Sequence, residues 1–172
     1  MHLENSYIKI EKSEGLGGII FAEGAKNSML PIAPAAFLAS GISILKNIPN
    51  SQDLKVMIEL MEYFGANCFY SESEKILKID TTNLKNEIAP LNLFQEYRAS
   101  TLFAGPLLAR FNEVFIGLPG GDKIGKRPLD IHLNAFKILG AEIEYKNDYI
   151  HVKAKKFNGG EIFLDYALIL IT

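Results

Sequence analysis

Apolar residues recur along the chain at two different spacings, which separate predicted helices from predicted strands. Apolar positions three and four residues apart between Leu54 and Phe64 predict an amphipathic helix over about 53–64, ended by Gly65. Short apolar or alternating runs bounded by Gly, Pro, Asn and Ser predict strands. These strands are expected over 7–10, 19–22, 42–45, 67–70, 76–80 and 114–118.

Two further segments, 28–39 and 99–109, are apolar on almost every side at helical spacing. Helices of this kind belong inside a protein, because no polar face is available for water. Pro34 is expected to kink or delay the first of them, since proline lacks the N–H of the helical hydrogen bond. The pattern predicts a fold whose units each bury one helix and expose a sheet and an amphipathic helix.

The order of the elements repeats. AKNSMLPIAP (25–34) aligns with YRASTLFAGP (97–106), which pairs Lys26 with Arg98 at a spacing of 72 residues, and farther on Asp53 pairs with Asp130. Each copy is predicted as helix, strand, helix, strand, strand, so the class is α/β built from repeated units. Residues 161–165 resemble the opening strand of a third copy. The chain then stops within an apolar run, so we expect it to be part of a longer protein.

Composition narrows the function classes. With 18 basic and 20 acidic side chains the net charge is −2, which indicates neither nucleic acid nor an acidic membrane as a partner. The single cysteine, Cys68, excludes an internal disulfide and a CxxC metal site and is typical of a small core residue in a reducing compartment. No signal-peptide pattern and no uninterrupted membrane-length apolar segment is seen, so cytoplasm is expected.

The most chemically loaded stretch is LPGGDKIGKRPLDIH (118–132). Between the paired prolines and aspartates the first copy has three residues and the second has ten, from 120 to 129, an insertion typical of a binding loop. A tolerated surface insertion is the alternative, although such insertions are rarely so rich in Gly, Lys and Arg. GxxxxGK is the skeleton of a nucleotide P-loop, but Arg127 replaces the magnesium-binding Ser or Thr and Pro128 lacks an amide N–H, so we reject that motif. A glycine-rich cationic loop entering a helix still suits a phosphorylated ligand.

Asp122 is the one acid inside this loop. To donate a proton near pH 7 its pKa would have to rise by ~2 to 3 from ~3.9. Lys123, Lys126 and Arg127 oppose that rise, whereas a bound phosphate would offset them, so acid catalysis is expected only in the liganded site. The alternative is an ordinary aspartate in a turn.

Other candidates lie at helix starts. Lys26 and Arg98 occupy equivalent positions in the two copies, where a cation beside free N–H groups favours an anion; each could also be a surface residue with a buried stem. Asp130 suits the dipole of the next helix in its own right. His132 could be a base or ligand, but a lone helical histidine is more often a hydrogen-bonded structural group, and no second His or acid at metal-ligand spacing accompanies it.

Three segments, EGAKNSMLPIAPAAFLA, YRASTLFAGPLLARF and LPGGDKIGKRPLDIHL, resemble the UDP-N-acetylglucosamine enolpyruvyl transferases, and the likeness runs from about residue 15 to 165. The resemblance implies an inside-out α/β barrel of two domains, each of three repeats with buried helices, and a site between the domains. Residues 1–22 would be strands of the second, mostly missing domain. Residues 23–172 would be the first barrel domain, with two repeats and the start of a third, about two-fifths of a typical member.

The implied activity transfers the enolpyruvyl group of phosphoenolpyruvate to the 3-hydroxyl of UDP-N-acetylglucosamine by addition and then elimination of phosphate, with no metal or other cofactor. It belongs to peptidoglycan precursor synthesis in the cytoplasm, and so to cell wall formation, cell shape and cell division. By position, Lys26 and Arg127 would hold the phosphate, Asn27 the sugar substrate, and Arg98 would act on the charged site. The nucleotide pocket would be lined by Arg127, Pro128, Leu129, Asp130 and His132. The missing carboxyl-terminal part would complete the site.

This sequence departs from the family at one reactive position. Most members have a cysteine where Asp122 stands, as general acid and as target of fosfomycin, and a minority have aspartate. Asp122 should keep the acid role and make the protein insensitive to fosfomycin. A non-catalytic nucleotide-sugar-binding lobe, or half of a split enzyme, is the alternative function. Relatives that transfer enolpyruvyl to shikimate 3-phosphate share the fold but lack the combination of GAKN and GGxxIGxRPxD, and rank well behind.

Overall fold

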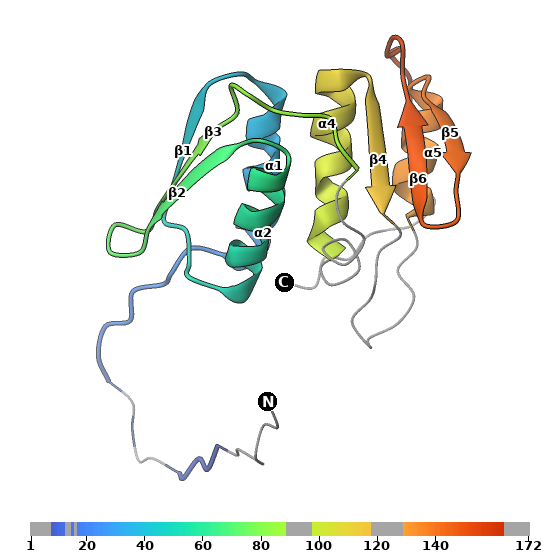
Figure 1. Ribbon diagram of the computed structural model, residues 1–172. Helices are drawn as coiled ribbons and strands as arrows, with labels where there is room; N and C mark the ends of the chain where they lie inside the picture. Colours follow the sequence, from blue (N-terminus) through green and yellow to red (C-terminus); the bar gives the residue numbers. More distant parts are fainter. Residues whose placement is uncertain (1–7, 13–14, 16, 89–97, 118–128, 164–172) are drawn as a thin grey trace.

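Two copies of one helix-strand-helix-strand-strand unit stand side by side (Figure 1). This computed structural model describes residues 8–12, 15, 17–88, 98–117 and 129–163. The first copy contains α1 (Lys26–Ala35), η1 (Ala36–Leu38), β1 (Ile42–Lys46), α2 (Gln52–Tyr63), β2 (Asn67–Ser71) and β3 (Ile76–Asp80). The second contains η2 (Arg98–Phe103), α4 (Ala104–Phe111), β4 (Glu113–Gly117), α5 (Asp130–Ile138), β5 (Glu142–Tyr145) and β6 (Tyr149–Lys153). The predicted internal repeat is confirmed.

Each copy forms a three-stranded sheet with the same topology. In sheet A (β1, β2, β3) the order is β1-β3-β2, and in sheet B (β4, β5, β6) it is β4-β6-β5. The last strand of each copy therefore lies between the two earlier ones and is antiparallel to both, as in the pairings Ile44↔Lys78 and Phe69↔Lys78. The two segments that share a hydrophobic pattern therefore share one strand topology.

The elements follow their local signals closely. Ser51 caps α2, because its hydroxyl accepts a hydrogen bond from the Leu54 N–H at 3.2 Å, and Gly65 ends the helix with a left-handed φ of 87°. Leu54, Met57 and Met61 of α2 are buried, as the three-and-four spacing predicted, and Val56 and Leu60 are buried as well, so the buried face is wider than predicted. The helix and the predicted strands over 42–45, 67–70, 76–80 and 114–118 are all confirmed to within one residue.

The two apolar helices are less regular than predicted. α1 starts at Lys26, runs through Pro31 and Pro34 and ends at Ala35, and the 3-10 turn η1 begins at Ala36, two residues after Pro34, which fits the loss of helical hydrogen bonds at proline. The second apolar segment is a 3-10 helix, η2, before it becomes α4. A delay of the helix by Pro34 is not observed, because α1 begins at Lys26, before the predicted start at residue 28, and a kink at Pro34 stays a prediction.

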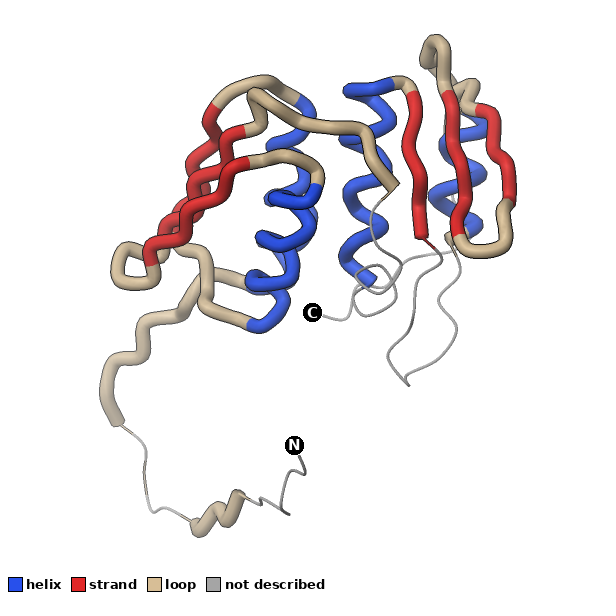
Figure 2. Tube along the Cα trace, viewed as in Figure 1, coloured by secondary structure: helices blue, strands red, loops and turns tan. Residues whose placement is uncertain are grey.

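Helices α1, α2 and α4 lie between the two sheets (Figure 2). Three phenylalanine rings meet there: Phe103 of η2 lies 5.3 Å from Phe37 of η1 and 5.6 Å from Phe64 at the end of α2, measured between ring centroids. All three are fully buried. Because Phe103 comes from the second copy and the other two from the first, this cluster joins the copies into one core.

Arg110 adds a polar link between the copies. From the last turn of α4, its guanidinium donates to the carbonyl oxygen of Phe37 at 3.4 Å and to that of Thr81 at 3.2 Å. Thr81 is itself completely buried, and its hydroxyl donates to the carbonyl oxygen of Ala39 at 2.7 Å. The turns that end η1 and β3 are thus held to α4 by side chains that satisfy buried carbonyl groups.

Two predictions about burial and strands need correction. α1 and η1 are buried on one face only, and Ile32 and Leu38 stay 50% and 59% exposed, because nothing in the described part of the chain covers their other face. Residues 8–10 and 19–22 form no strand, and Ile20 is 95% exposed, since an extended segment without a neighbour has no ladder of hydrogen bonds. Likewise, 161–163 form no strand.

Whether residues 1–22 belong to a second domain stays a prediction. None of the helices in the described ranges has the length and apolarity needed to cross a membrane.

Candidate functional site

In the part of the chain that the structure describes, the α-helices all begin at one edge (Figure 1). In Figure 1, α1, α2, α4 and α5 run the same way, with their amino-terminal ends toward the bottom of the view. This follows from the repeat, because every helix is followed by a strand that runs back in the opposite direction. Helix amino termini carry partial positive charge and unpaired N–H groups, so this edge, which we call the amino-terminal edge, is suited to anions.

Lys26 and Asn27 are the first two residues of α1 and are exposed at the amino-terminal edge. Lys26 Nζ lies 3.1 Å from Oδ2 of Asp53, an acid in the first turn of α2. The side chain of Lys26 is 48% exposed and that of Asp53 is 29% exposed. Lys26 therefore lies at the amino-terminal end of its helix, as predicted. The sequence had paired Asp53 with Asp130 in the repeat, but it did not indicate that Asp53 contacts Lys26.

The backbone before Lys26 is held by a close contact. A Cβ on Gly24 would lie 1.7 Å from the carbonyl oxygen of Asn47, so only glycine fits there without moving one of the two segments. Asn47 follows β1 in a left-handed conformation with a φ of 58°. Next to this contact, Lys75 Nζ pairs with Glu23 Oε1 at 2.6 Å and lowers the pKa of that carboxyl. The start of α1 is thus fixed against two turns of the first copy.

The second copy contributes residues at the start of α5. Asp130 is the first residue of α5, exposed, and its Oδ1 accepts from the Ile131 N–H at 3.0 Å. His132 is exposed and Leu129 packs partly against the core. Arg98 begins η2, although the structure does not describe its side chain, and Asp122, Arg127 and Pro128 lie outside the described residues. Predicted substrate residues of both copies thus begin helices at the amino-terminal edge, and their roles stay predictions.

Cys68 is partly buried on β2, where burial, with a smaller contribution from Glu62, raises the pKa of its thiol to about 12. At neutral pH the sulfur is therefore a thiol with little nucleophilic thiolate. This agrees with the predicted role as a small core residue.

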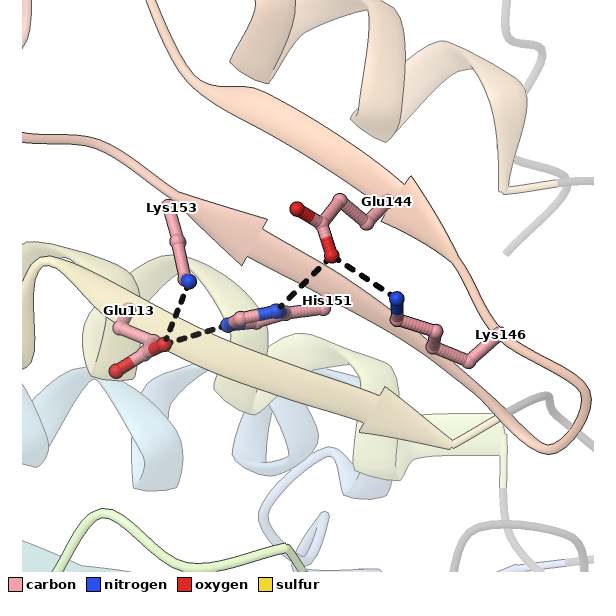
Figure 3. Close-up of polar contacts among 5 residues, drawn as sticks. All are labelled: Glu113, Glu144, Lys146, His151 and Lys153. Atoms are coloured by element: carbon pink, nitrogen blue, oxygen red, sulfur yellow. Dashed lines mark hydrogen bonds and ion pairs between the residues drawn. The ribbon is translucent and has the colours of Figure 1, made fainter.

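A polar network that the sequence did not reveal covers the outer face of sheet B (Figure 3). His151 is 8% exposed, and its Nε2 donates to Glu113 Oε1 at 2.6 Å, since a carboxylate only accepts. Its Nδ1 lies 3.8 Å from Oε2 of Glu144, and Lys153 Nζ lies 3.6 Å from Glu113 Oε1. Lys146, 3.1 Å from Glu144, lowers the pKa of that carboxyl.

Register explains why these side chains meet. His151 lies directly opposite Phe115 on one side and Glu144 on the other, and its ring stacks on that of Phe115 at 4.4 Å and 14°. Cross-strand neighbours of this kind stabilise a sheet. The strand register would have identified this network, but the β4–β6 register brings together residues that lie far apart in the sequence, such as Glu113 and His151, which are 38 positions apart. The network lies on strands and not at the amino-terminal edge, so we read it as structural.

Comparison with known proteins agrees with the resemblance stated above. The chain is 43% identical over 157 residues to UDP-N-acetylglucosamine 1-carboxyvinyltransferase 1 of Caldanaerobacter subterraneus subsp. tengcongensis, covering 91% of this chain and 37% of that protein. It is 42% identical over 154 residues to the protein of the same name from Carboxydothermus hydrogenoformans, covering 90% of this chain and 36% of that protein. The chain thus spans little more than a third of the length of these curated relatives.

The fold has a match among solved structures. The enolpyruvyl transferase NikO from Streptomyces tendae superposes with a TM-score of 0.70 at 18% identity, over 83% of this chain and 31% of that one. At this identity the match concerns fold alone, and it agrees with the predicted enolpyruvyl transferase type. A family model described as EPSP synthase (3-phosphoshikimate 1-carboxyvinyltransferase) matches residues 10–168. Since that match takes in nearly the whole sequence, the chain belongs to the EPSP synthase (3-phosphoshikimate 1-carboxyvinyltransferase) family.

Proposed function

We propose that this chain forms the amino-terminal part of an enzyme that transfers the enolpyruvyl group of phosphoenolpyruvate to the 3-hydroxyl of UDP-N-acetylglucosamine. The observation that carries the proposal is the identity above 40% to relatives named for that substrate, over about nine-tenths of this chain. The amino-terminal edge supports it, because Lys26 stands among helix starts suited to a phosphorylated substrate. The proposal includes the cytoplasmic role in peptidoglycan synthesis, cell shape and division that the resemblance implies.

Each predicted residue has a role in this chemistry. Lys26 and Arg127 would hold the phosphate of phosphoenolpyruvate, Arg98 would act on the charged site, and Asn27 would bind the sugar. In the addition step the substrate hydroxyl oxygen bonds to C2 of phosphoenolpyruvate, the hydroxyl proton passes to water, and C3 takes a proton from Asp122. Elimination then breaks the C2–O bond to phosphate, which leaves, and a C3 proton passes back to the Asp122 carboxylate, which regenerates the double bond. Residues from Arg127 to His132 would line the nucleotide pocket.

The architecture proposed for the whole protein is the inside-out barrel. Its support is the observed repeat, with helices gathered between the sheets, and the fold similarity to NikO. The exposed faces of Ile32 and Leu38 would be covered by a third repeat, and residues 1–22 would belong to a second domain. The remainder of the protein would then complete the site across the cleft.

A second candidate is a non-catalytic nucleotide-sugar-binding lobe or half of a split enzyme, since the chain spans 37% of the length of one curated relative and its activity is a proposal. Titration calorimetry with UDP-N-acetylglucosamine, with and without phosphoenolpyruvate, combined with a phosphate-release assay, separates these functions. We expect binding by this chain and phosphate release only when the missing part is supplied. Release by the chain alone would contradict its being incomplete. Release that requires shikimate 3-phosphate as acceptor would contradict the proposed substrate.

Fosfomycin is expected to leave the protein unmodified. Fosfomycin is an epoxide, and a thiolate is the group that attacks it. Asp122 offers only a carboxylate at the reactive position. The one cysteine, Cys68, stays protonated because its pKa is raised to about 12. Intact mass spectrometry after incubation with the drug and UDP-N-acetylglucosamine at pH 7 checks this. An adduct mapped to the 118–128 peptide would disprove the assignment of Asp122 as a poor nucleophile, and an adduct on Cys68 would disprove the unreactive thiol.

A further inference from the structure

The ion pair of Lys26 with Asp53 connects the amino-terminal ends of two helices of the first copy. Asp53 lies in the first turn of α2, where Ser51 caps the helix and five buried residues hold it to the core. Its carboxylate is partly buried, at 29% exposure, and is favoured by the α2 dipole. Asp53 is therefore a fixed anionic group that faces Lys26 from a rigid element.

Lys26 is the more mobile partner. Its side chain is 48% exposed and ends a four-carbon stem that has many rotamers when it is free. The ammonium group has three donors, so the contact with Asp53 Oδ2 at 3.1 Å leaves other N–H groups for a ligand. The pair restrains the position of the ammonium without using up its capacity to bind an anion.

Backbone and side chain are thus restrained separately. The Gly24 contact with Asn47 sets where α1 starts, and Asp53 sets where the Lys26 ammonium lies beyond that start. A cation ordered before the ligand arrives loses less conformational entropy when it binds. The negative charge of Asp53 works against an incoming anion, but the amino terminus of α2 offsets part of that charge.

We propose that Asp53 is a positioning residue, which orders Lys26 at the amino-terminal edge for the phosphate of phosphoenolpyruvate. This inference rests on the proposed function, in which Lys26 holds that phosphate. Asp53 itself does not contact the substrate. It acts through Lys26, so its removal should disorder the ammonium and weaken binding without abolishing it.

The test compares Asp53→Asn, Asp53→Glu and a control, Glu59→Gln, which removes one exposed negative charge farther along α2. The order parameter of the Lys26 ammonium is measured by ¹⁵Nζ NMR, with the resonance assigned through Lys26→Arg. Affinity for phosphoenolpyruvate in the presence of UDP-N-acetylglucosamine is measured by calorimetry at low and high salt. Circular dichroism verifies that every variant is folded.

We expect Asp53→Asn to lower the Lys26 order parameter and to weaken phosphoenolpyruvate binding roughly two- to five-fold at low salt, the range of a partly exposed ion pair. Asp53→Glu should restore part of both, and Glu59→Gln should change neither. Unchanged order, or tighter binding, in Asp53→Asn would overturn the inference. If the original chain binds no phosphoenolpyruvate, the proposed function fails for this chain, while a loss of order in Asp53→Asn would still support the restraint of Lys26.

Discussion

Replacing Phe103 by alanine is expected to lower the free energy of unfolding by ~3 to 5 kcal/mol, the usual effect of removing a buried aromatic ring. Phe103 is fully buried and contacts the rings of Phe37 and Phe64 across the boundary between the two copies. Because domains of this size are stable by only ~5 to 15 kcal/mol, much of the margin would be lost. Denaturant titration followed by circular dichroism measures the change.

The control for this prediction is Phe69→Ala, the same chemical change on the outer face of sheet A, where the ring is 61% exposed. We expect it to lower the stability much less, because little apolar surface returns to water. Phe103→Ala should also broaden or split the unfolding transition, since the contacts that couple the unfolding of one copy to that of the other would be weakened. Equal losses in the two variants would show that the three-ring cluster does not join the copies.

Replacing Asp122 by asparagine in the complete protein is expected to lower kcat by ~10²- to 10⁴-fold, the contribution of a positioned general acid. Asparagine keeps the size of the side chain and removes the proton that C3 of phosphoenolpyruvate requires. Phosphate release under saturating substrates measures the effect, and calorimetry should find both substrates bound nearly as before. The loss should therefore fall on kcat and much less on KM.

Asp122→Cys supplies the informative comparison. A cysteine is also an acid and is the residue that most members of the resembled family carry, so this variant should retain much of the activity and become sensitive to fosfomycin. Because the general acid acts in its protonated form, the kcat of the original protein should fall as pH rises through the pKa of Asp122, and Asp122→Cys should move that limb to higher pH. Full activity in Asp122→Asn would exclude Asp122 as the acid.

Much of the local structure was predictable because its causes are local. α2 follows from apolar spacing, a serine cap and a terminal glycine between Ser51 and Gly65, and β3 from a short alternating run between turns. The repeat was visible because equivalent helices begin with matching residues, Lys26 and Arg98. Prediction was wrong for 19–22, where a strand-like pattern has no neighbouring strand in the described chain.

For the candidate site, the sequence indicated which residues could bind a substrate, and the structure showed which side chains they contact. Lys26 was predicted as a cation at a helix start, and it is there, but its partner Asp53 lies 27 positions away and becomes visible only when α1 and α2 pack together. The same is true of His151 and Glu113, which meet through the β4–β6 register. Nothing in the local pattern at either residue indicated the other.

The sequence by itself determined the α/β class, the two copies, most element boundaries and a set of cations at helix starts, because periodicity, capping and turn residues act over a few positions. Only the tertiary structure decided that the helix starts share one edge, that Phe103 joins the copies and that Asp53 pairs with Lys26. Those outcomes depend on which distant segments pack together, and that choice is made by the burial of the whole apolar surface at once.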